Sequence, residues 1–340
     1  MIESGVNCTL CSLGCRCGGF ANSGNAMIKK TVGAFCVAAL LGSGAAVAQD
    51  KWYPSPFGKD DQAGRSNLMT PDQVKKAMGY IKQGKTISLA RTYSDKMPLF
   101  GHRVFATRGT NGLSGGPLGD NNVTWMDDTL TAEIGQVGTQ FDGLGHTGIG
   151  NKYYNGIDIN EAFGPTGMKK LGIEHVKPFF TKGVLVDMVA FKGKPMDGGQ
   201  EITVADMEGA LKKQGLSAGS IGKGNVVMFH TGWVRYWIKD NKTYNGAAPG
   251  IGIEAARWLA KKGVVIVGSD TWPLEVVPNP NPKMVFPVHQ ILLTQNGVFI
   301  HENAATERLA AEKVYEFAYI FNPLAVKGGT GSPGNALAAY

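Results

Sequence analysis

The chain has 340 residues, of which 43% are hydrophobic and 18% charged, with a formal net charge of +7. This balance supplies enough apolar side chains for a sizeable core and excludes a disordered chain, a collagen-like chain and a coiled coil. Lysine and arginine are scattered, without a basic run of five or more, so we expect no nucleic-acid partner. Glycine is frequent, at 48 residues, which indicates many tight turns.

The first 48 residues carry the pattern of an export signal. From Met27, two lysines, a short apolar stretch and the small residues Ala46-Val47-Ala48 follow the order of a secretory signal peptide. The apolar stretch is too short to span a bilayer. We therefore expect residues 1–26 to precede the true start, residues 27–48 to be removed, and residues 49–340 to be periplasmic or secreted, without membrane insertion after cleavage.

All five cysteines lie before the predicted cleavage point. Four of them, between Cys8 and Cys17, have a spacing that could bind zinc or an iron–sulfur cluster. The surrounding glycine, serine and asparagine residues offer no fold to orient the thiolates, so we favour the interpretation without metal. The exported chain then has no disulfide and no thiol nucleophile, and its stability depends on its core.

The rest of the chain alternates helices and strands at irregular intervals. Helices with a capping threonine or a closing glycine are expected over residues 71–83, 204–215 and 251–262. Apolar runs predict strands over residues 86–92, 184–189, 225–230, 264–267, 297–301 and 318–321. Residues 101–122 are rich in glycine and polar residues and predict a long loop over a site. Without an internal repeat or a linker, the pattern predicts a single α/β domain over residues 49–340.

The motifs of nucleophilic and nucleotide-binding enzymes are absent from the sequence. There is no G-x-S-x-G elbow and no P-loop, and Gly250-Ile251-Gly252 lacks the preceding strand that a dinucleotide-binding turn requires. With cysteine also excluded, the remaining chemistry is metal-assisted, for which histidine, aspartate and glutamate are the usual side chains.

A glycine-rich segment and an apolar strand end hold the candidate metal ligands. Asp142 and His146 can reach one ion if the chain between them turns tightly, and Gln140 shares a face with Asp142 if that stretch is extended. Glu302 follows an apolar strand, where a buried carboxylate is costly unless it is paired or bound to a metal. His289 precedes that strand. The alternative interpretation is a turn cap at Asp142, a satisfied core histidine at His146 and a lysine partner for Glu302.

Residues 138–146 resemble the signature H-x-G-T-H-x-D-x-P-x-H of the metal-dependent cyclase family, which contains bacterial kynurenine formamidase and isatin hydrolase. Further segments similar to this family follow in the expected order, at residues 181–187, 226–233, 268–272, 287–290, 302–303 and 328–333. The resemblance covers nearly all of residues 52–335. It implies the swivelling β/β/α fold of kynurenine formamidase, a homodimer or higher homo-oligomer, and metal-dependent hydrolysis of a formyl or cyclic amide, or of a lactone.

The resemblance also implies roles for individual residues. Asp142 matches a metal ligand of the family, and His289 and Glu302 match the residues that complete the site. His146 matches the general acid/base. The implied cofactor is a divalent metal ion, either manganese or zinc, and the implied partner is a small molecule, an aromatic or cyclic amide.

The chain departs from the signature at its first two histidines, which are replaced by Gln136 and Gln140. A glutamine offers an amide oxygen to a metal but cannot shuttle protons, so Gln140 remains only a candidate ligand. The loss of two imidazoles shifts the preference from zinc towards harder ions such as manganese, and can reduce a two-metal site to one.

Four further residues are candidates for substrate binding: His102, His230, Trp233 and Trp272. His102 adjoins the glycine-rich stretch, and the other three can supply a pocket wall for an aryl substrate. The alternative is an exposed loop histidine and three residues that pack in the core.

We therefore expect an exported metal-dependent amidohydrolase. Two alternatives remain open from the residues alone. The first is an exported small-molecule binding protein of the same fold, which lost turnover through Gln136 and Gln140. The second is a metal-independent lyase or cyclase that uses His146 as a base.

Overall fold

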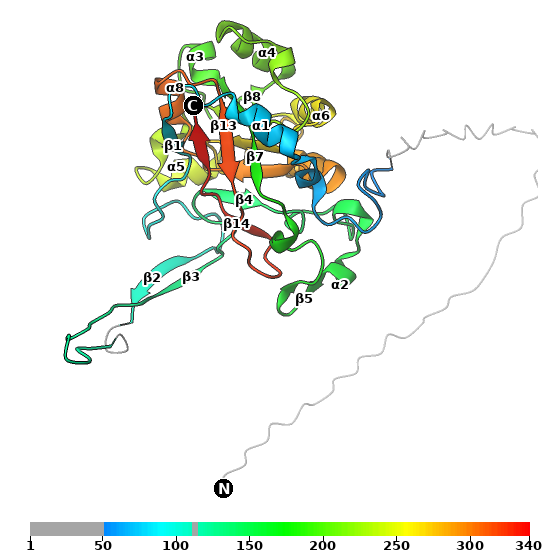
Figure 1. Ribbon diagram of the computed structural model, residues 1–340. Coiled ribbons are helices and arrows are strands. Elements are labelled where there is room, and N and C mark those ends of the chain that lie inside the picture. Colours follow the sequence, from blue (N-terminus) through cyan, green and yellow to red (C-terminus); the bar gives the residue numbers. More distant parts are fainter. Residues whose placement is uncertain (1–50, 111–114) are drawn as a thin grey trace, which may run out of the picture. The chain divides into compact units, whose positions relative to one another are not determined.

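The computed structural model describes residues 51–110 and 115–340. A nine-stranded mixed sheet forms the centre of this part of the chain (Figure 1). The predicted signal peptide and the cysteine cluster lie outside the described residues. In spatial order, the strands of the sheet are β1 (Thr86–Ser88), β15 (Leu337–Ala339), β13 (Glu316–Phe321), β7 (Phe179–Asp187), β9 (Val226–His230), β11 (Ile266–Ser269), β12 (Phe299–Glu302), β4 (Gln140–Asp142) and β14 (Gly331–Pro333).

Short helices and three two-stranded sheets surround this main sheet. The helices are α1 (Pro71–Met78), α2 (Ile159–Ala162), α3 (Met188–Lys192), α4 (Val204–Lys213), α5 (Asn241–Gly246), α6 (Ile253–Lys262), α7 (Pro287–His289) and α8 (Glu307–Ala311). The small sheets pair β2 (Phe105–Gly109) with β3 (Asp128–Ala132), β5 (Phe163–Gly164) with β6 (Gly167–Met168), and β8 (Glu201–Ile202) with β10 (Gly250–Ile251). No helix among the described residues is long and apolar enough to cross a membrane.

The four central strands, β7, β9, β11 and β12, run parallel and are buried on both faces. Their side chains alternate between two hydrophobic clusters, as in β7, where Leu185 joins one cluster while Val184 and Val186 join the other. Buried parallel strands require apolar residues at successive positions, which is why these strands read as continuous apolar runs in the sequence. The α/β class predicted from the sequence is confirmed.

Each face of the sheet has its own cover. On one face, α4 and α6 contribute Met207, Leu211 and Leu259 to the cluster around Val184 and Val186. On the other face, the rings of Phe141, Phe179, Phe299 and Phe321 pack together, with centroids 4.8–6.4 Å apart where neighbours meet. Aromatic packing of this kind keeps β4 and β12 in a rigid position relative to the rest of the sheet.

Two capped helices begin where the sequence predicts. The Thr70 hydroxyl accepts a hydrogen bond from the Gln73 amide, and Thr203 forms a capping box with Asp206. The prediction for the end of α1 was wrong, because the helix ends at Met78 rather than near Gln83. Gly79 is the C-cap, and glycine is a poor residue for continuing a helix.

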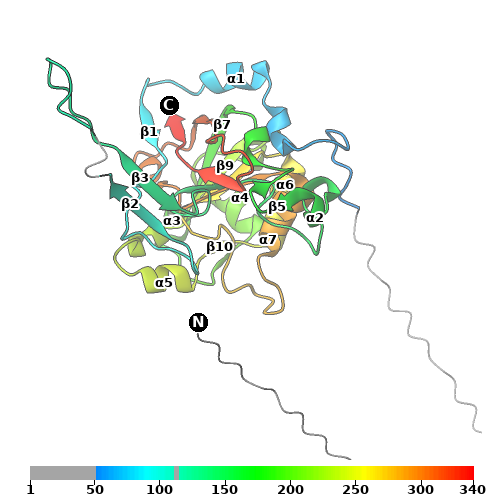
Figure 2. The same ribbon diagram turned by 90° about the horizontal axis from the view of Figure 1, so that it is seen from below.

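The prediction of a loop over residues 101–122 was wrong in part. Part of this segment forms β2, which pairs with β3 in antiparallel register from Phe105 opposite Ala132 to Gly109 opposite Asp128. The hairpin projects from the rest of the chain in both ribbon views (Figures 1 and 2). Most of its residues are exposed, so the sequence lacks the apolar alternation that identifies a half-buried strand.

His301, on β12, is fully buried. Its Nε2 donates a hydrogen bond to the Gly334 carbonyl at 3.0 Å, so its Nδ1 carries the lone pair that accepts from the Tyr319 hydroxyl at 3.0 Å. Burial lowers the pKa of His301 to about 4. The folded chain therefore keeps this imidazole neutral.

We predict that His301 destabilises the folded chain in acid. An unfolded histidine has a pKa of about 6.5, so below that pH the unfolded chain binds a proton that the folded chain does not. Stability then falls as the pH drops from 6.5 towards 4, by about 3 kcal/mol for this residue. Denaturant unfolding between pH 7 and 4 should show a weaker loss in His301→Gln. The exposed His175→Gln is the control, and equal losses in all three proteins would contradict the prediction.

Candidate metal centre

The pairing of β4 with β12 places two carboxylates side by side. Glu302 lies opposite Gln140, and Ile300 lies opposite Asp142, in an antiparallel register. Because side chains alternate along a strand, Phe141 enters the aromatic core while Gln140 and Asp142 face the other way. Asp142 and Glu302 are both buried. The sheet thus brings together residues that are 160 positions apart in the sequence.

His289, at the end of α7, lies next to the same two carboxylates. It is buried, and its Nδ1 lies 2.6 Å from Glu275 Oε1, which also accepts the backbone amide of His289 at 3.0 Å. The other Glu275 oxygen accepts the Val288 amide. A carboxylate cannot donate, so the proton of the imidazole lies on Nδ1 and the lone pair on Nε2. Glu275 therefore fixes both the orientation and the tautomer of His289.

Three atoms with lone pairs converge at this point. His289 Nε2 lies 3.3 Å from Glu302 Oε1 and 3.7 Å from Asp142 Oδ2. Neither carboxylate oxygen has a hydrogen-bond partner among the described residues. Buried polar atoms are normally paired, so two unpaired carboxylate oxygens beside an imidazole nitrogen fit a bound cation. This donor set of two oxygens and one nitrogen suits a divalent metal ion.

The ionisation of these residues also favours positive charge at the centre. Burial lowers the pKa of His289, but the hydrogen bond to Glu275 and the attraction to Glu275 and Glu302 outweigh it, so the pKa lies well above its usual value. Burial and the neighbouring Asp142 carboxylate raise the pKa of Glu302 to about 7. Both shifts favour an additional proton where the lone pairs meet, and a metal ion would take the place of that proton.

The two glutamines that replace signature histidines each donate a hydrogen bond to the carboxylate oxygen that faces away from His289. Gln140 Nε2 donates to Glu302 Oε2 at 2.7 Å, and Gln136 Nε2 donates to Asp142 Oδ1 at 2.9 Å. Each carboxylate therefore has one oxygen held by an amide and one oxygen free. Gln140 was predicted as a candidate metal ligand, whereas in this arrangement its amide nitrogen orients the Glu302 carboxylate, which can be a ligand.

His146 lies in the loop after β4, half-buried beside the centre. Its ring centroid is 6.1 Å from that of His289, and one of its nitrogens lies within 4.8 Å of ligand atoms of Asp142 and His289. The geometry therefore admits His146 as a ligand or as a proton-transfer group next to the ion. Burial, together with the positive charges near it, lowers the pKa of His146 and keeps the imidazole neutral, although Asp142 acts in the opposite direction.

A cavity of about 200 Å³ opens above these residues. His146, His289, Glu302 and Gln140 line its floor, and the predicted substrate residue Trp272 lies in its wall. Phe100 stacks on Trp272 with ring centroids 4.4 Å apart, and Phe286 packs edge-on against Trp272 at 6.1 Å. The centre thus lies at the bottom of a small cavity with an aromatic wall.

The other three predicted substrate residues are not among those that line this cavity. His102 is exposed in the turn before β2. Trp233 is buried, and its indole nitrogen donates to the Tyr244 carbonyl. His230 is buried at the end of β9, where its Nδ1 lies 3.0 Å from Thr306 Oγ1. Their roles in substrate binding stay predictions.

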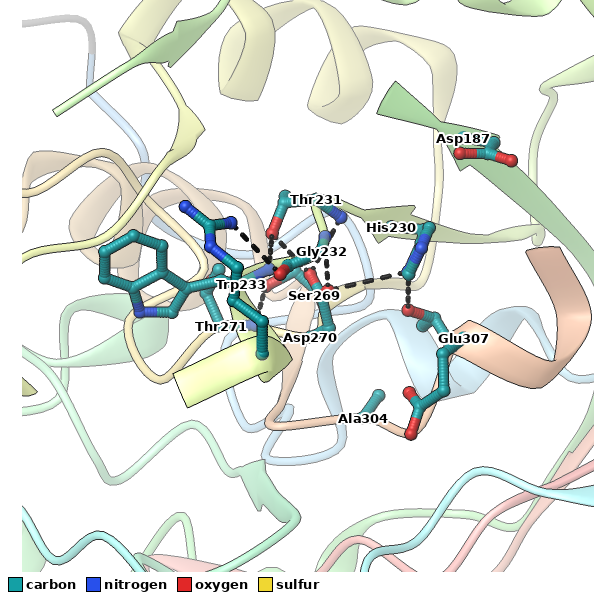
Figure 3. A network of polar contacts seen from close by, with 12 residues as sticks. Asp187, His230, Thr231, Gly232, Trp233, Ser269, Asp270, Thr271, Ala304 and Glu307 are labelled. Carbon is teal, nitrogen blue, oxygen red and sulfur yellow. Dashed lines mark hydrogen bonds and ion pairs between the residues drawn. The ribbon is translucent and has the colours of Figure 1, made fainter. Parts of the chain in front are cut away.

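Asp270 accepts most of the hydrogen bonds in a polar network between the ends of β9 and β11 (Figure 3). It is fully buried and accepts hydrogen bonds from the Thr231 amide, the Thr231 hydroxyl and the Gly232 amide, at 2.6–2.9 Å. His230 Nδ1 lies 3.5 Å from the same carboxylate. These bonds fix the turns that follow both strands, and Trp272 of the cavity wall lies two residues beyond Asp270.

Asn303 connects this network to the metal centre. Its Nδ2 donates to the Gly138 carbonyl at 2.7 Å, and its Oδ1 accepts from the Tyr244 hydroxyl, which also donates to the Asp270 carbonyl. The Thr139 hydroxyl donates to the Asn303 carbonyl. The residue after Glu302 therefore ties the chain that carries Gln140 and Asp142 to the end of β12.

Two residues of the site, Glu275 and Arg103, were not predicted from the sequence. Glu275 has a signal that could have found it, because it is a lone carboxylate in the apolar run Leu274-Glu275-Val276-Val277. Arg103 lines the cavity, and its Nη2 donates to Gln136 Oε1 at 3.2 Å. It had no such signal, because an arginine in a glycine-rich stretch resembles an ordinary surface residue.

The fold and the site define an α/β protein of the cyclase type with a candidate divalent-metal centre. A family model described as "Putative cyclase" matches residues 87–276. A crystal structure described as a novel cyclase is 32% identical, with a TM-score of 0.75, and the match covers 84% of this chain and 98% of that one. The chain therefore belongs to the cyclase family, as the resemblance implied.

More distant solved structures share the fold. Isatin hydrolase A from Ralstonia solanacearum is 20% identical, with a TM-score of 0.56 over 79% of this chain and 98% of that one. Isatin hydrolase A from Labrenzia aggregata, bound to benzyl benzoate, is also 20% identical, with a TM-score of 0.55 over 75% and 93% of the two chains. A comparison with curated proteins finds no match.

We predict that Glu275→Gln weakens metal binding while the chain stays folded. The amide keeps the shape of the carboxyl group but removes its negative charge. That charge orients His289 and makes its Nε2 lone pair a better ligand for a metal ion. Loss of such a support typically lowers metal affinity by about 10- to 100-fold. Competition with a fluorescent chelator measures the affinity, and Glu201→Gln, an exposed glutamate outside the centre, is the control. Unchanged affinity in Glu275→Gln would contradict this role.

Proposed function

We propose that this protein is a metal-dependent hydrolase of a small formyl or cyclic amide, or of a lactone. The observation that carries the proposal is the convergence of Asp142 Oδ2, Glu302 Oε1 and His289 Nε2 at an open cavity, where neither of these two carboxylate oxygens has a hydrogen-bond donor among the described residues. A neutral half-buried imidazole, His146, lies beside them.

Asp142, His289 and Glu302 would hold a divalent ion, either manganese or zinc. Such an ion polarises a carbonyl oxygen and makes a water molecule acidic enough to react near neutral pH. Gln136 and Gln140 each occupy one carboxylate oxygen, which leaves the two free oxygens directed at a single position. This arrangement supports one ion rather than two.

His146 is the proposed general acid/base. Its lowered pKa leaves the ring neutral near pH 7, so it can take a proton from the attacking water. The same proton is then available for the leaving nitrogen or oxygen when the bond to the carbonyl carbon breaks. Both transfers use one imidazole, and the ring returns to its starting state after each turnover.

The substrate class has support from the cavity and from the comparisons. The stacked Phe100 and Trp272 offer a flat apolar wall that suits a planar ring. The isatin hydrolases that share this fold are named for isatin, a cyclic amide fused to an aromatic ring. A planar cyclic amide or a related lactone is therefore the class that we propose.

The cellular location and the oligomeric state of the protein are also part of the proposal. Residues 27–48 have the order of charged, apolar and small residues of an export signal, so we propose a periplasmic or secreted enzyme. A homodimer or higher homo-oligomer remains a prediction from the family resemblance.

We predict that Asp142→Asn and Glu302→Gln each lose most of the bound metal, because each removes the charge of one ligand. His146→Ala should keep the metal but lose activity by about 10²- to 10⁴-fold, the usual contribution of a general acid/base. Metal content of purified protein is measured by inductively coupled plasma mass spectrometry. Asp187→Asn, a buried carboxylate at the end of β7, is the control. Full metal occupancy in both ligand variants would contradict the centre, whereas loss of metal in His146→Ala would make His146 a ligand.

We predict that hydrolysis depends on the metal. Protein freed of metal by chelation should not hydrolyse a panel of isatin, N-formylkynurenine and dihydrocoumarin, and added manganese or zinc should restore activity on at least one of them. Activity that survives complete chelation would favour a metal-independent lyase or cyclase. Stoichiometric metal without hydrolysis of any amide or lactone would favour the binding protein.

A further inference from the structure

Arg103 brings a positive charge into the cavity above the metal centre. It is half-buried and lies among the lining residues together with His146, His289 and Glu302. Its Nη2 donates to Gln136, and the amide of Gln136 donates in turn to Asp142 of the centre. The guanidinium therefore lies close enough to reach a molecule that is bound over the metal ligands.

The guanidinium is largely free to bind a ligand. Of its five N–H groups, the described part of the chain pairs one, through the bond from Nη2 to Gln136 Oε1. No aspartate or glutamate among the described residues forms a salt bridge with it. By contrast, Arg91, Arg235, Arg257 and Arg308 each have a carboxylate partner. An arginine that lines a cavity without an acidic partner is suited to an anionic ligand.

The segment that carries Arg103 is held in place on both sides. Asn245 donates to the Leu99 carbonyl at 2.9 Å, and the Phe100 ring stacks on Trp272. After Arg103, the Val104 amide donates to Glu133 at 2.6 Å. The guanidinium itself lies 5.7 Å from the Phe100 ring centre and is bonded to Gln136. Arg103 is therefore placed before any ligand arrives, which lowers the entropy cost of binding.

The lining of the cavity leaves Arg103 without an acidic partner. Asp142 and Glu302 face the proposed ion, and Glu302 is the one acidic side chain among the lining residues. Glu275, the third buried carboxylate, is bonded to His289, so none of these carboxylates forms a salt bridge with Arg103. Gln136 links the two parts of the site, because its amide donates to Asp142 and accepts from Arg103. A neutral ligand would leave the guanidinium in the cavity without a partner of opposite charge.

We propose that the substrate carries a carboxylate, which pairs with Arg103 while its planar ring lies against Phe100 and Trp272 and its reacting carbonyl faces the metal centre. The substrate class is a small ring, unsaturated or aromatic, with a cyclic amide or lactone and one free carboxylate. This inference rests on the proposed function for the reacting carbonyl only. The carboxylate subsite can be tested by binding alone.

The test compares trans-cinnamate with trans-cinnamamide, two probes of the same shape that differ in charge. Isothermal titration calorimetry measures their binding to zinc-loaded protein. We expect cinnamate to bind at least about 10-fold more tightly, and this preference to fall by roughly 10- to 100-fold in Arg103→Gln, because charge-assisted bonds to arginine are lost. Arg103→Lys should keep part of the preference, since it retains the charge without the planar fork. Arg257→Gln, which removes an exposed arginine of α6, is the control.

A carboxylate could also bind the metal, and a metal-free protein separates the two cases. The double variant Asp142→Asn/Glu302→Gln lacks both the proposed ligands and their negative charge, so a metal ion no longer contributes to the preference for the anion. The preference for cinnamate should persist there and disappear when Arg103→Gln is added. Equal preference with and without Arg103, in either background, would overturn the proposal, and so would the absence of any preference in the wild-type protein. Neither result depends on turnover, so they are distinct from a failure of the hydrolase assignment.

Discussion

Two buried carboxylates face one imidazole nitrogen, and most of the site consists of groups that hold this arrangement. Unless a proton or a metal ion lies between them, the lone pairs of the buried Asp142, Glu302 and His289 side chains repel one another. Glu275 keeps the proton of His289 on the far side of the ring, and the glutamines hold the outer carboxylate oxygens. These supports leave one position where all three atoms point, which is the condition for binding one metal ion.

The fold separates rigid and adaptable parts of the site. The carboxylates lie on β4 and β12, which are held by the aromatic core and by the hydrogen bond from Asn303 to the Gly138 carbonyl. The cavity wall comes instead from connecting segments, which carry Phe100, Arg103 and Trp272. Family members with the same metal-binding strands can therefore differ in substrate, because changes in these segments leave the strands in place.

Much of the fold and part of the site could be predicted from the sequence. Capped helices and buried parallel strands have local signals, since the caps and the apolar runs are encoded by neighbouring residues. Glu302 was predicted because a carboxylate at the end of an apolar strand needs a partner, and Asp142 because of its spacing to His146 in a glycine-rich segment. The β2–β3 hairpin and the role of Arg103 were missed, because an exposed strand and an exposed-looking arginine have no local pattern that distinguishes them.

The sequence alone determined the α/β class and the family, and it predicted Asp142, His289 and Glu302 as metal ligands, because composition, periodicity and motif order depend only on neighbours along the chain. Only the tertiary structure decided how these residues meet. The register of β4 against β12 sets which carboxylate oxygens are free, and the packing of distant segments places Glu275 behind His289 and Arg103 above it. Such contacts join residues far apart in the chain, and their geometry follows from packing the whole core.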